Sequence, residues 1–236
     1  MVLLGLWQLL RLTPLIVNDM GMMINRRRAY GGKKRLLPSG YRQLEYIENT
    51  SNAYIDTGIV PSRDFGIEMD CYILTEISDS ARSTKIFGSS KFNGGPWGGI
   101  MISTWPSTAG GQMSWCNAYG VSGGLNPKLK TYERITFKCI NNVYTAQDGT
   151  ITYINYRSDN HLYGTCYLFT IHTDYTALTS AGLRVYNTKI YEGYNVVRNF
   201  IPCKNPNNIV GMYDTVNGVF YSSPNGTAFV SGPRVS

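Results

Sequence analysis

The chain has 236 residues, 43% hydrophobic and 16% charged, which suits one large β-rich domain with a buried core. The formal net charge is +7, but seven of the 22 basic side chains and only one of the 15 acidic side chains fall in residues 1–37. The remainder carries 15 basic and 14 acidic side chains, so a strongly basic domain that tracks nucleic-acid phosphates is excluded.

Residues 1–36 are interpreted as an N-terminal arm. Leu3, Leu6, Trp7 and Leu10 fall at the spacing of one helix face. Arg11 interrupts this apolar run, which is shorter than the roughly 20 residues that a membrane span needs and lacks a small-residue cleavage site. We therefore expect neither a membrane span nor a secretory signal.

The arm ends in a basic cluster, which comprises Arg26, Arg27, Arg28, Lys33, Lys34 and Arg35. Such a cluster can dock on an acidic protein or on nucleic acid, and it is equally typical of a solvated linker. A translation start at Met20, Met22 or Met23 is a third alternative for the apolar part. We interpret the cluster as a particle-docking segment, with no specific nucleic-acid partner.

Residues 37–236 predict a single all-β domain. Ile67, Met69, Cys71 and Ile73 alternate with polar or tyrosine side chains, the period of a strand with one buried face. Positions 148–149 (Asp-Gly) and 217–218 (Asn-Gly) predict two-residue hairpin turns. No long run has helical periodicity. Further predicted strands span residues 84–88, 98–102, 112–118, 134–139, 143–147, 150–156, 167–172, 183–191 and 196–201.

Two sets of motifs stand at opposite ends of this domain. Residues 37–48 read LPSGYRQLEYIE and residues 53–58 read AYIDTG, whereas residues 197–203 read VRNFIPC, 210–214 read VGMYD and 217–221 read NGVFY. Together they resemble the start and finish of LamG-like (concanavalin A-like) jelly-roll domains, which are abundant in bacteriophage structural proteins and gut-bacterial surface proteins.

The resemblance covers about residues 36–233. It implies a jelly-roll sandwich of two antiparallel sheets whose terminal strands lie side by side. A departure from the pattern is Thr188, where the family commonly has a large apolar residue. Pro202 and Cys203 are expected to turn and pack rather than to act on a substrate.

The cysteines predict a reduced protein. Their number is odd and no pair has the spacing of a metal clip, so all five are expected to be free thiols, as in a protein folded in a cytosol. They are Cys71, Cys116, Cys139, Cys166 and Cys203.

Catalytic motifs are sparse, and no catalytic residue is predicted. The resemblance extends to glycoside hydrolases that place Glu-x-Asp-x-(x)-Glu on one strand, and Glu68 and Asp70 begin that pattern. Tyr72 and Ile73 occupy the positions where the final glutamate should stand. We interpret the two carboxylates as the outward polar face of a strand.

Calcium is the one cofactor for which the resemblance gives grounds, because many LamG-like domains hold one ion at the rim of the sandwich. Calcium takes six to eight oxygen ligands. Asp148, Asp159 and Asp174 are the loop candidates, although no Asp-x-Asp-x-Asp-Gly loop is present and solvated loop aspartates are an alternative.

Glycan binding is the ligand chemistry that the composition favours, because sugar rings stack on exposed aromatic side chains and amides hydrogen-bond their hydroxyls. Trp97 and Trp105 fall in Gly-, Pro- and Ser-rich segments where a core role is not evident. The predicted ligand-binding residues are Trp97, Trp105, Trp115, Asn117 and Tyr119.

These features predict a non-enzymatic bacteriophage virion protein, as a head fibre, capsid decoration or tail-associated component. Its arm would attach to other virion proteins and its domain would bind cell-surface or mucosal glycans. One alternative is a bacterial surface or secreted adhesion module. Another is a purely structural module that forms a homo-oligomer.

Overall fold

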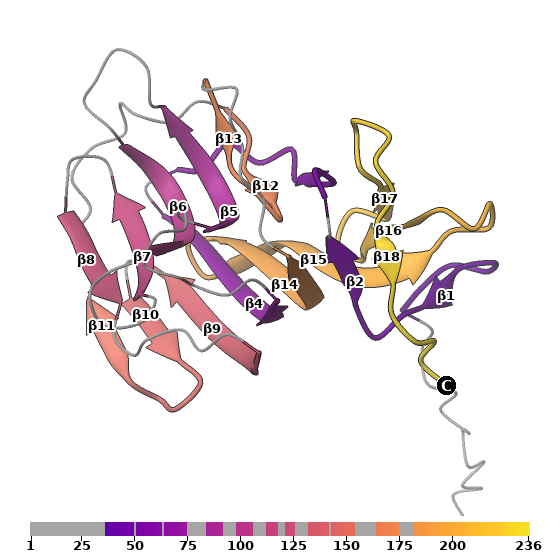
Figure 1. The fold of residues 1–236 in the computed structure, drawn as a ribbon, viewed down its shortest axis with the longest axis horizontal. Coiled ribbons are helices and arrows are strands. Elements are labelled where there is room, and N and C mark those ends of the chain that lie inside the picture. The colour runs from indigo at the N-terminus through magenta and orange to yellow at the C-terminus, as the bar shows by residue number, and fades with distance from the viewer. Residues whose placement is uncertain are drawn as a thin grey trace, which may run out of the picture. The chain divides into compact units, whose positions relative to one another are not determined.

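The computed structural model describes residues 36–49, 51–62, 64–74, 84–91, 98–105, 112–117, 121–125, 132–141, 143–153, 164–174 and 182–236, with the backbone alone for 84, 91, 98–105, 112–117, 121–125 and 152–153. All of them belong to one compact unit, Arg35–Ser236. They form 18 β-strands in two sheets and no helix, so the all-β prediction is confirmed for them (Figure 1). It follows that none of these residues lies in a helix long and apolar enough to cross a membrane.

The larger sheet has eleven strands. Eight of them follow the order β11-β10-β9-β4-β14-β15-β16-β17, while β2 pairs with β14 and β18, and β1 pairs with β15. The strands are β1 (Arg42–Gln43), β2 (Ile47–Asn49), β4 (Phe65–Ile73), β9 (Arg134–Ile140), β10 (Val143–Ala146), β11 (Ile151–Tyr153), β14 (Leu183–Glu192), β15 (Asn195–Lys204), β16 (Val210–Asp214), β17 (Val219–Tyr221) and β18 (Val230–Ser231).

The smaller sheet has seven strands, in the order β3-β12-β5-β6-β7-β8, with β13 also paired to β5. All pairs in the two sheets are antiparallel except β13 with β5, which is parallel. The strands are β3 (Ile55–Asp56), β5 (Thr84–Lys91), β6 (Gly98–Trp105), β7 (Gln112–Asn117), β8 (Val121–Leu125), β12 (Tyr167–Leu168) and β13 (His172–Thr173).

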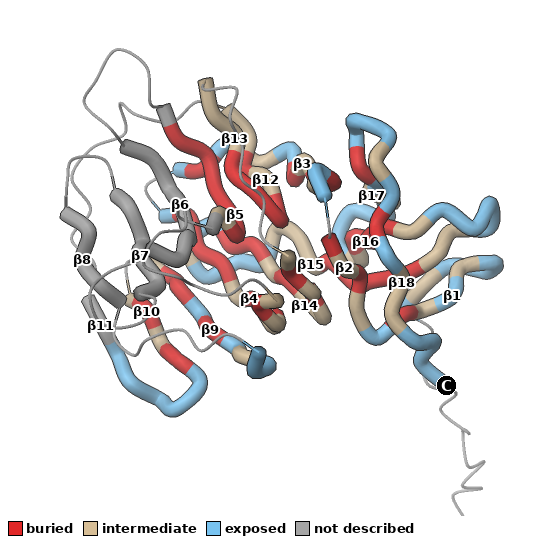
Figure 2. The backbone as a smooth tube through the Cα atoms, in the orientation of Figure 1, coloured by how far each residue is buried: buried red, intermediate tan, exposed pale blue. Residues whose placement is uncertain are grey.

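Strand β4 has the burial pattern that its sequence predicts. Ile67, Met69, Cys71 and Ile73 are fully buried, and the residues between them are partly exposed (Figure 2). A strand between two sheet neighbours can bury one face and hydrate the other only with this alternation. The face of the larger sheet that points away from the core is called its outer face below.

A β-bulge in β14 changes which of its residues reach the core. Val185 pairs with Cys71, but Asn187 pairs with Asp70, so Tyr186 is an extra residue on the β14 side. An inserted residue shifts the alternation by one position. As a result Thr188 is buried, where an unbroken strand would have buried Lys189.

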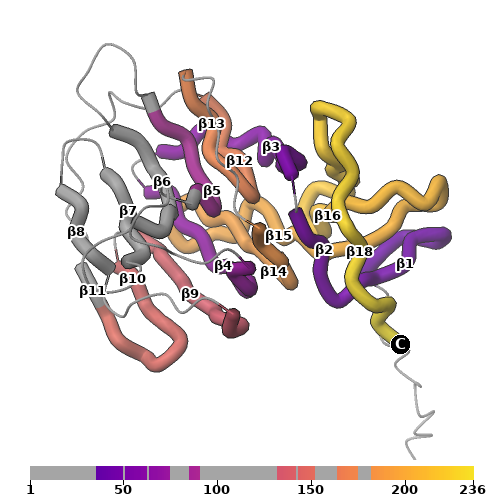
Figure 3. Tube along the Cα trace, in the orientation of Figure 1, coloured from indigo at the N-terminus to yellow at the C-terminus, as the bar shows by residue number. Residues whose placement is uncertain are grey.

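The two ends of the domain lie together, as the resemblance implies. Strand β18 pairs with β2, and Leu44 forms a bridge with Arg234. Figure 3 shows the indigo N-terminal segment of the domain beside the yellow C-terminal segment. Cys203 is buried, but Pro202 lies within β15 and its carbonyl accepts a hydrogen bond from the Leu44 amide at 2.9 Å, so it packs without making a turn.

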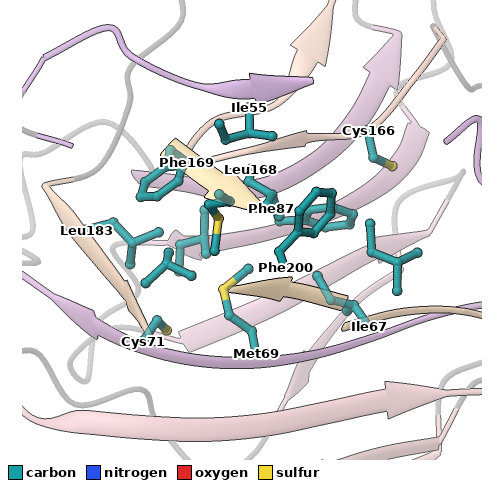
Figure 4. Close-up of a cluster of buried hydrophobic side chains, with 14 of the residues drawn as sticks. Ile55, Ile67, Met69, Cys71, Phe87, Cys166, Leu168, Phe169, Leu183 and Phe200 are labelled. Carbon is teal, nitrogen blue, oxygen red and sulfur yellow. The ribbon is translucent and has the colours of Figure 1, made fainter. Parts of the chain in front are cut away.

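A single hydrophobic cluster joins the two sheets (Figure 4). Phe87 from the smaller sheet stacks on Phe65 from the larger sheet, with ring centroids 5.7 Å apart. Phe200 of β15 and Leu168 of β12 belong to the same cluster. Burial of these side chains is the main favourable contribution to folding, at about 1.5–3 kcal/mol for each fully buried one.

Two local predictions are wrong. The expected strand 167–172 is split, because Phe169 has a φ of 72° and reverses the chain. As a result β12 runs antiparallel to β5 and β13 runs parallel to it. The two hairpins exist, but their loops have more than two residues: Thr145 pairs with Ile151, and Asp214 pairs with Val219.

Four of the five cysteines have described side chains, and all four are free and buried, as predicted. Burial raises the pKa of Cys139 and of Cys203 to about 12. Thiols held in this neutral form are poor nucleophiles and serve as small core residues.

Candidate functional site

Most of the predicted site residues lie outside the described residues. These are Trp97, Tyr119, Asp159 and the basic cluster Arg26, Arg27, Arg28, Lys33, Lys34 and Arg35. For Trp105, Trp115 and Asn117 the backbone alone is described, on β6 and β7. Position 105 pairs with Gln112, position 115 with Ile102, and position 117 with Val121.

Backbone pairing separates positions 105 and 115. Ile102 pairs with both Phe87 and Trp115, so position 115 belongs to the row of the core residue Phe87. Gly88 pairs with Tyr167 on one side and with Met101 on the other. Because every second position of a strand belongs to the same face, position 105 falls on the face of Met101 and Tyr167, but four residues, roughly 13 Å, further along β6 than Met101.

The predicted calcium ligands are not assembled within the described part of the chain, where no group of three or more metal-ligating side chains occurs. Asp148 is exposed at the β10–β11 turn, and its Oδ1 accepts a 2.9 Å hydrogen bond from the Thr150 amide. This hydrogen bond lowers the pKa of Asp148. Asp174 follows β13, with its Oδ1 3.5 Å from the Thr173 hydroxyl. Since Asp159 lies outside the described residues, the calcium site stays a prediction.

The two carboxylates of the partial hydrolase motif are engaged by cations. Asp70 accepts hydrogen bonds from Nε and Nη2 of Arg134, at 2.8 and 2.7 Å. Glu68 accepts Lys189 Nζ at 2.7 Å and the Tyr191 hydroxyl at 2.9 Å. Burial raises the pKa of Glu68, but these two hydrogen bonds and the charges of Lys189 and Lys138 outweigh burial and leave it lowered.

The C-terminal motifs form a polar network around Asp214, whose side chain is fully buried although its hydrogen-bond donors lie on half-buried and exposed residues. Its Oδ1 accepts the amides of Asn199 and Val216, each at 3.0 Å, and its Oδ2 accepts the Asn217 side chain at 2.7 Å. Arg198 Nε lies 3.5 Å from the same Oδ2. Burial of a carboxylate is costly, and hydrogen bonds and a nearby positive charge of this kind offset that cost.

Arg198 also connects the C-terminal motifs to the N-terminal ones. Its Nε donates to the Thr57 carbonyl at 3.2 Å. A Cβ at Gly58 would lie 3.8 Å from its Nη2. Arg198 therefore connects the motifs at the two ends of the domain, and its contacts give that residue a role in folding.

An aromatic column stands on the smaller sheet. It comprises Tyr54, Tyr167 and His172, all partly exposed. The rings of Tyr54 and Tyr167 stack at 4.5 Å and 25°, and those of Tyr167 and His172 at 4.2 Å and 7°. Partly exposed aromatic rings suit the apolar face of a sugar ring.

The column is fixed by its surroundings. The Tyr54 amide donates to Ser223 Oγ at 3.1 Å, and His172 Nδ1 lies 3.0 Å from the Thr165 carbonyl. Gly164 has a φ of 138°, and a Cβ there would lie 3.1 Å from His172 Cε1. The sequence did not single out this column, because only the chain reversal at Phe169 brings His172 beside Tyr167.

A second surface, the tyrosine–arginine face, lies on the outer face of the larger sheet. It comprises Tyr46, Tyr72, Arg134, Arg184 and Tyr186. Arg134 lies over the Tyr186 ring at 3.8 Å, and Arg184 lies over the rings of Tyr46 and Tyr72 at 4.8 and 5.4 Å. Tyr46 and Tyr186 are in edge contact at 5.3 Å.

Both arginines of this face are paired with carboxylates. Arg184 Nε donates to Glu48 Oε2 at 2.6 Å. The hydrogen bond from Arg134 to Asp70 raises the pKa of Arg134, and the hydrogen bond to Glu48 raises that of Arg184. The two guanidinium groups therefore keep a fixed charge and a fixed orientation.

Comparison with known proteins does not show a family. No protein-family model matches the chain, and no curated protein matches it. Among solved structures, a mutant of Trypanosoma rangeli sialidase displaying trans-sialidase activity is similar, with 9% identity and a TM-score of 0.37. The match covers 55% of this chain and 20% of the sialidase chain, and a likeness this weak carries no argument about fold or function.

Proposed function

We propose that this protein is a non-enzymatic glycan-binding module with a concanavalin A-like jelly-roll fold, and that the aromatic column on the smaller sheet is its sugar-binding surface. The observation that carries the proposal is the stacking of Tyr54, Tyr167 and His172 in a partly exposed column. The two sheets joined by one core and the pairing of β2 with β18 support the fold assignment.

The column suits a sugar because it combines apolar ring faces with polar groups at fixed positions. Asp56 pairs with Tyr167 across β3 and β12, and its Oδ1 is anchored by the Gly58 amide at 2.9 Å. A carboxylate beside aromatic rings can accept hydrogen bonds from sugar hydroxyls. Because position 105 belongs to the same face of the smaller sheet as Tyr167, Trp105 is proposed as a further aromatic contact along this face.

The proposal that the protein is not a glycosidase is supported by the state of Glu68 and Asp70. A retaining or inverting glycosidase needs one carboxylic acid with a raised pKa. The pKa of Glu68 is instead lowered, and Asp70 holds Arg134 through both carboxylate oxygens. A carboxylate with a lowered pKa is a poor proton donor at neutral pH, and one that holds an arginine through both oxygens is engaged in an ion pair.

We further propose that the protein is a bacteriophage virion component and that its basic arm docks on other virion proteins. The charge distribution supports this division, since seven basic side chains and one acidic side chain fall in residues 1–37. The arm would then supply attachment and the domain would supply recognition.

A glycan-array experiment on the full chain tests the proposed function. We expect specific binding, and we expect Tyr54→Ala, His172→Ala and Trp105→Ala each to weaken it by about tenfold or more, as for loss of a ring-stacking contact. The control is Tyr194→Ala, because Tyr194 is 82% exposed in the β14–β15 turn. Running the array with calcium and with a chelator tests the calcium prediction.

Absence of binding in both conditions would contradict the proposed function, as would equal loss in the Tyr194 control. Thermal unfolding of every variant is needed, so that a misfolded variant is not counted as one that has lost its binding site.

A further inference from the structure

The outer face of the larger sheet carries a concentrated set of charges that the aromatic column does not use. Four cations, Arg134, Lys138, Arg184 and Lys189, come from β9 and β14, which flank β4 on either side. Their side chains are 56%, 50%, 31% and 34% exposed. All four are therefore accessible to a ligand.

Cross-strand pairing arranges these groups in rows. Tyr72 of β4 pairs with Arg134 on one side and Arg184 on the other, and Arg184 also pairs with Glu48 of β2. A second row has Glu68 between two lysines, which belong to β9 and β14. Directly opposed side chains in a sheet lie close enough to interact, so the rows place alternating charges and rings across four strands.

The arginines of this face retain hydrogen-bonding capacity. Arg184 donates only Nε to Glu48, and neither of its terminal nitrogens has an acceptor among the described residues. Arg134 donates Nε and one terminal nitrogen to Asp70, and its Nη1 has no acceptor there either. A guanidinium group has five N–H donors in a rigid fork, which matches the geometry of a carboxylate.

These donors are pre-organised. The Tyr186 ring supports Arg134 at 3.8 Å, and the rings of Tyr46 and Tyr72 lie beneath Arg184. A free arginine side chain would lose rotamer entropy when it bound a ligand, whereas one that is already held by a carboxylate and a ring loses less. Pre-organisation of this kind increases affinity without further contacts.

From this geometry we propose that the tyrosine–arginine face is a second binding site, separate from the aromatic column, and that it takes a polysaccharide carrying carboxylate groups. The terminal nitrogens of Arg134 and Arg184 bind the carboxylates, with the two lysines of the adjacent row contributing attraction. The partly exposed tyrosine rings contact the sugar rings between the acidic groups.

The same face disfavours a nucleic acid. Three carboxylates, Glu48, Glu68 and Asp70, stand among the four cations, so the face has almost no net charge. A phosphate backbone has one charge per nucleotide and would meet these carboxylates at close range, and proteins that track it present a strongly basic surface. A polyuronate also carries one charge per unit, but its sugar hydroxyls can donate hydrogen bonds to these carboxylates.

Calorimetric titration of the full chain with alginate, a polyuronate, and with neutral dextran tests the proposal at 0.15 M salt. We expect alginate to bind and dextran not to bind at this face. Arg134→Gln and Arg184→Gln should each weaken alginate binding about tenfold, the loss that one charge-assisted hydrogen bond accounts for. The matched control is Arg42→Gln, an exposed arginine of β1 that holds Asn208 instead.

Four outcomes would overturn the proposal. The first is no alginate binding, and the second is an equal loss in Arg42→Gln, which would indicate unspecific attraction to a chain of net charge +7. The third is loss of binding when Arg26, Arg27 and Arg28 are changed to alanine but not when Arg134 or Arg184 is changed. Equal competition by single-stranded DNA would likewise count against a polyuronate site.

The design separates this site from the proposed function. Tyr54→Ala and His172→Ala should leave alginate binding unchanged, and the two arginine variants should leave array binding at the column unchanged. Failure of one site therefore leaves the other intact.

Discussion

Two arginine–carboxylate pairs in the larger sheet differ in burial and therefore in consequence. Arg198 and Asp214 are 17% and 0% exposed, with a closest distance of 3.5 Å. Arg134 and Asp70 are 56% and 21% exposed, at 2.7 Å. The pair with the shorter distance is the more exposed to water, so distance alone does not decide how much an ion pair contributes to the stability of the fold.

The difference follows from desolvation. Asp214 is fully buried and its partner Arg198 is largely buried, so removal of the carboxylate leaves a poorly hydrated positive charge without its counter-charge. Asp70 and Arg134 can be rehydrated, so their pair contributes little to stability and its arginine remains free to bind a ligand. The buried pair thus stabilises the fold, whereas the exposed pair lies on a surface that a ligand can reach.

The largest expected effect is that of Asp214→Ala, which we expect to lower the free energy of unfolding by about 3–5 kcal/mol, because it leaves the largely buried charge of Arg198 without its carboxylate partner. Urea unfolding followed by tryptophan fluorescence or circular dichroism measures this loss. Asp70→Ala is the control, with an expected loss below about 1 kcal/mol. Similar losses of stability in the two variants would contradict the conclusion that burial decides the contribution of each pair.

Thr188→Val tests the opposite case, a buried polar group that lacks a partner. Thr188 is fully buried, and its Oγ1 has no hydrogen-bond partner among the described residues. We expect valine to raise the free energy of unfolding by about 1 kcal/mol, since it removes an unsatisfied hydroxyl at nearly constant volume. In the matched control Thr57→Val, the lost hydroxyl donates to the Cys166 carbonyl at 2.7 Å, so that variant should be less stable than the wild type.

A double-mutant cycle on Arg134 and Asp70 measures directly how much the exposed pair contributes to stability. We expect a coupling free energy of about 0.2–1 kcal/mol, because both side chains exchange contacts with water when the pair is broken. Arg134→Gln, Asp70→Asn and the double variant, compared by urea unfolding, give this value. A coupling above about 2 kcal/mol would place this pair in the same class as the buried one.

The smallest expected effect is the contribution of Glu68 to acid stability. Its pKa in the folded protein lies below the ordinary value of 4.5, so its contribution is complete above pH 4.5 and is lost as the pH falls through the folded pKa. Solvent screening keeps this contribution small. Unfolding of wild type and Glu68→Gln between pH 7 and pH 3 should show a slightly shallower loss of stability in the variant, and a steeper loss would contradict the ion pairs described here.

Local sequence patterns predicted the strand content well. Alternation in residues 67–73 identified β4, and the runs 183–191 and 196–201 anticipated β14 and β15 within a few residues. These elements were predictable because burial on one face imposes period two on the sequence. The short strands β1, β2, β3 and β18 were not predicted as strands, since two or three residues carry no period.

The candidate surfaces were less predictable. Glu68 and Asp70 were expected on an outward face, but their partners lie on β9 and β14, far away in sequence. Tyr54 and Tyr167 were not selected at all, because each looks like an ordinary strand tyrosine until the sheet places one ring on the other. Cross-strand contacts depend on register, and register is a property of the folded sheet.

The sequence by itself determined the all-β class of the described domain, its buried faces, the neutrality of the domain beside a basic arm, and the free thiols of the four described cysteines. These follow from composition and from period-two burial, which need no knowledge of the partner strand. The tertiary structure decided that the motifs of both ends meet at Arg198, that a bulge at Tyr186 buries Thr188, and that three aromatic rings form a column. The physical reason is that hydrogen bonds and ring contacts act over a few ångströms in space, irrespective of how far apart the residues stand along the chain.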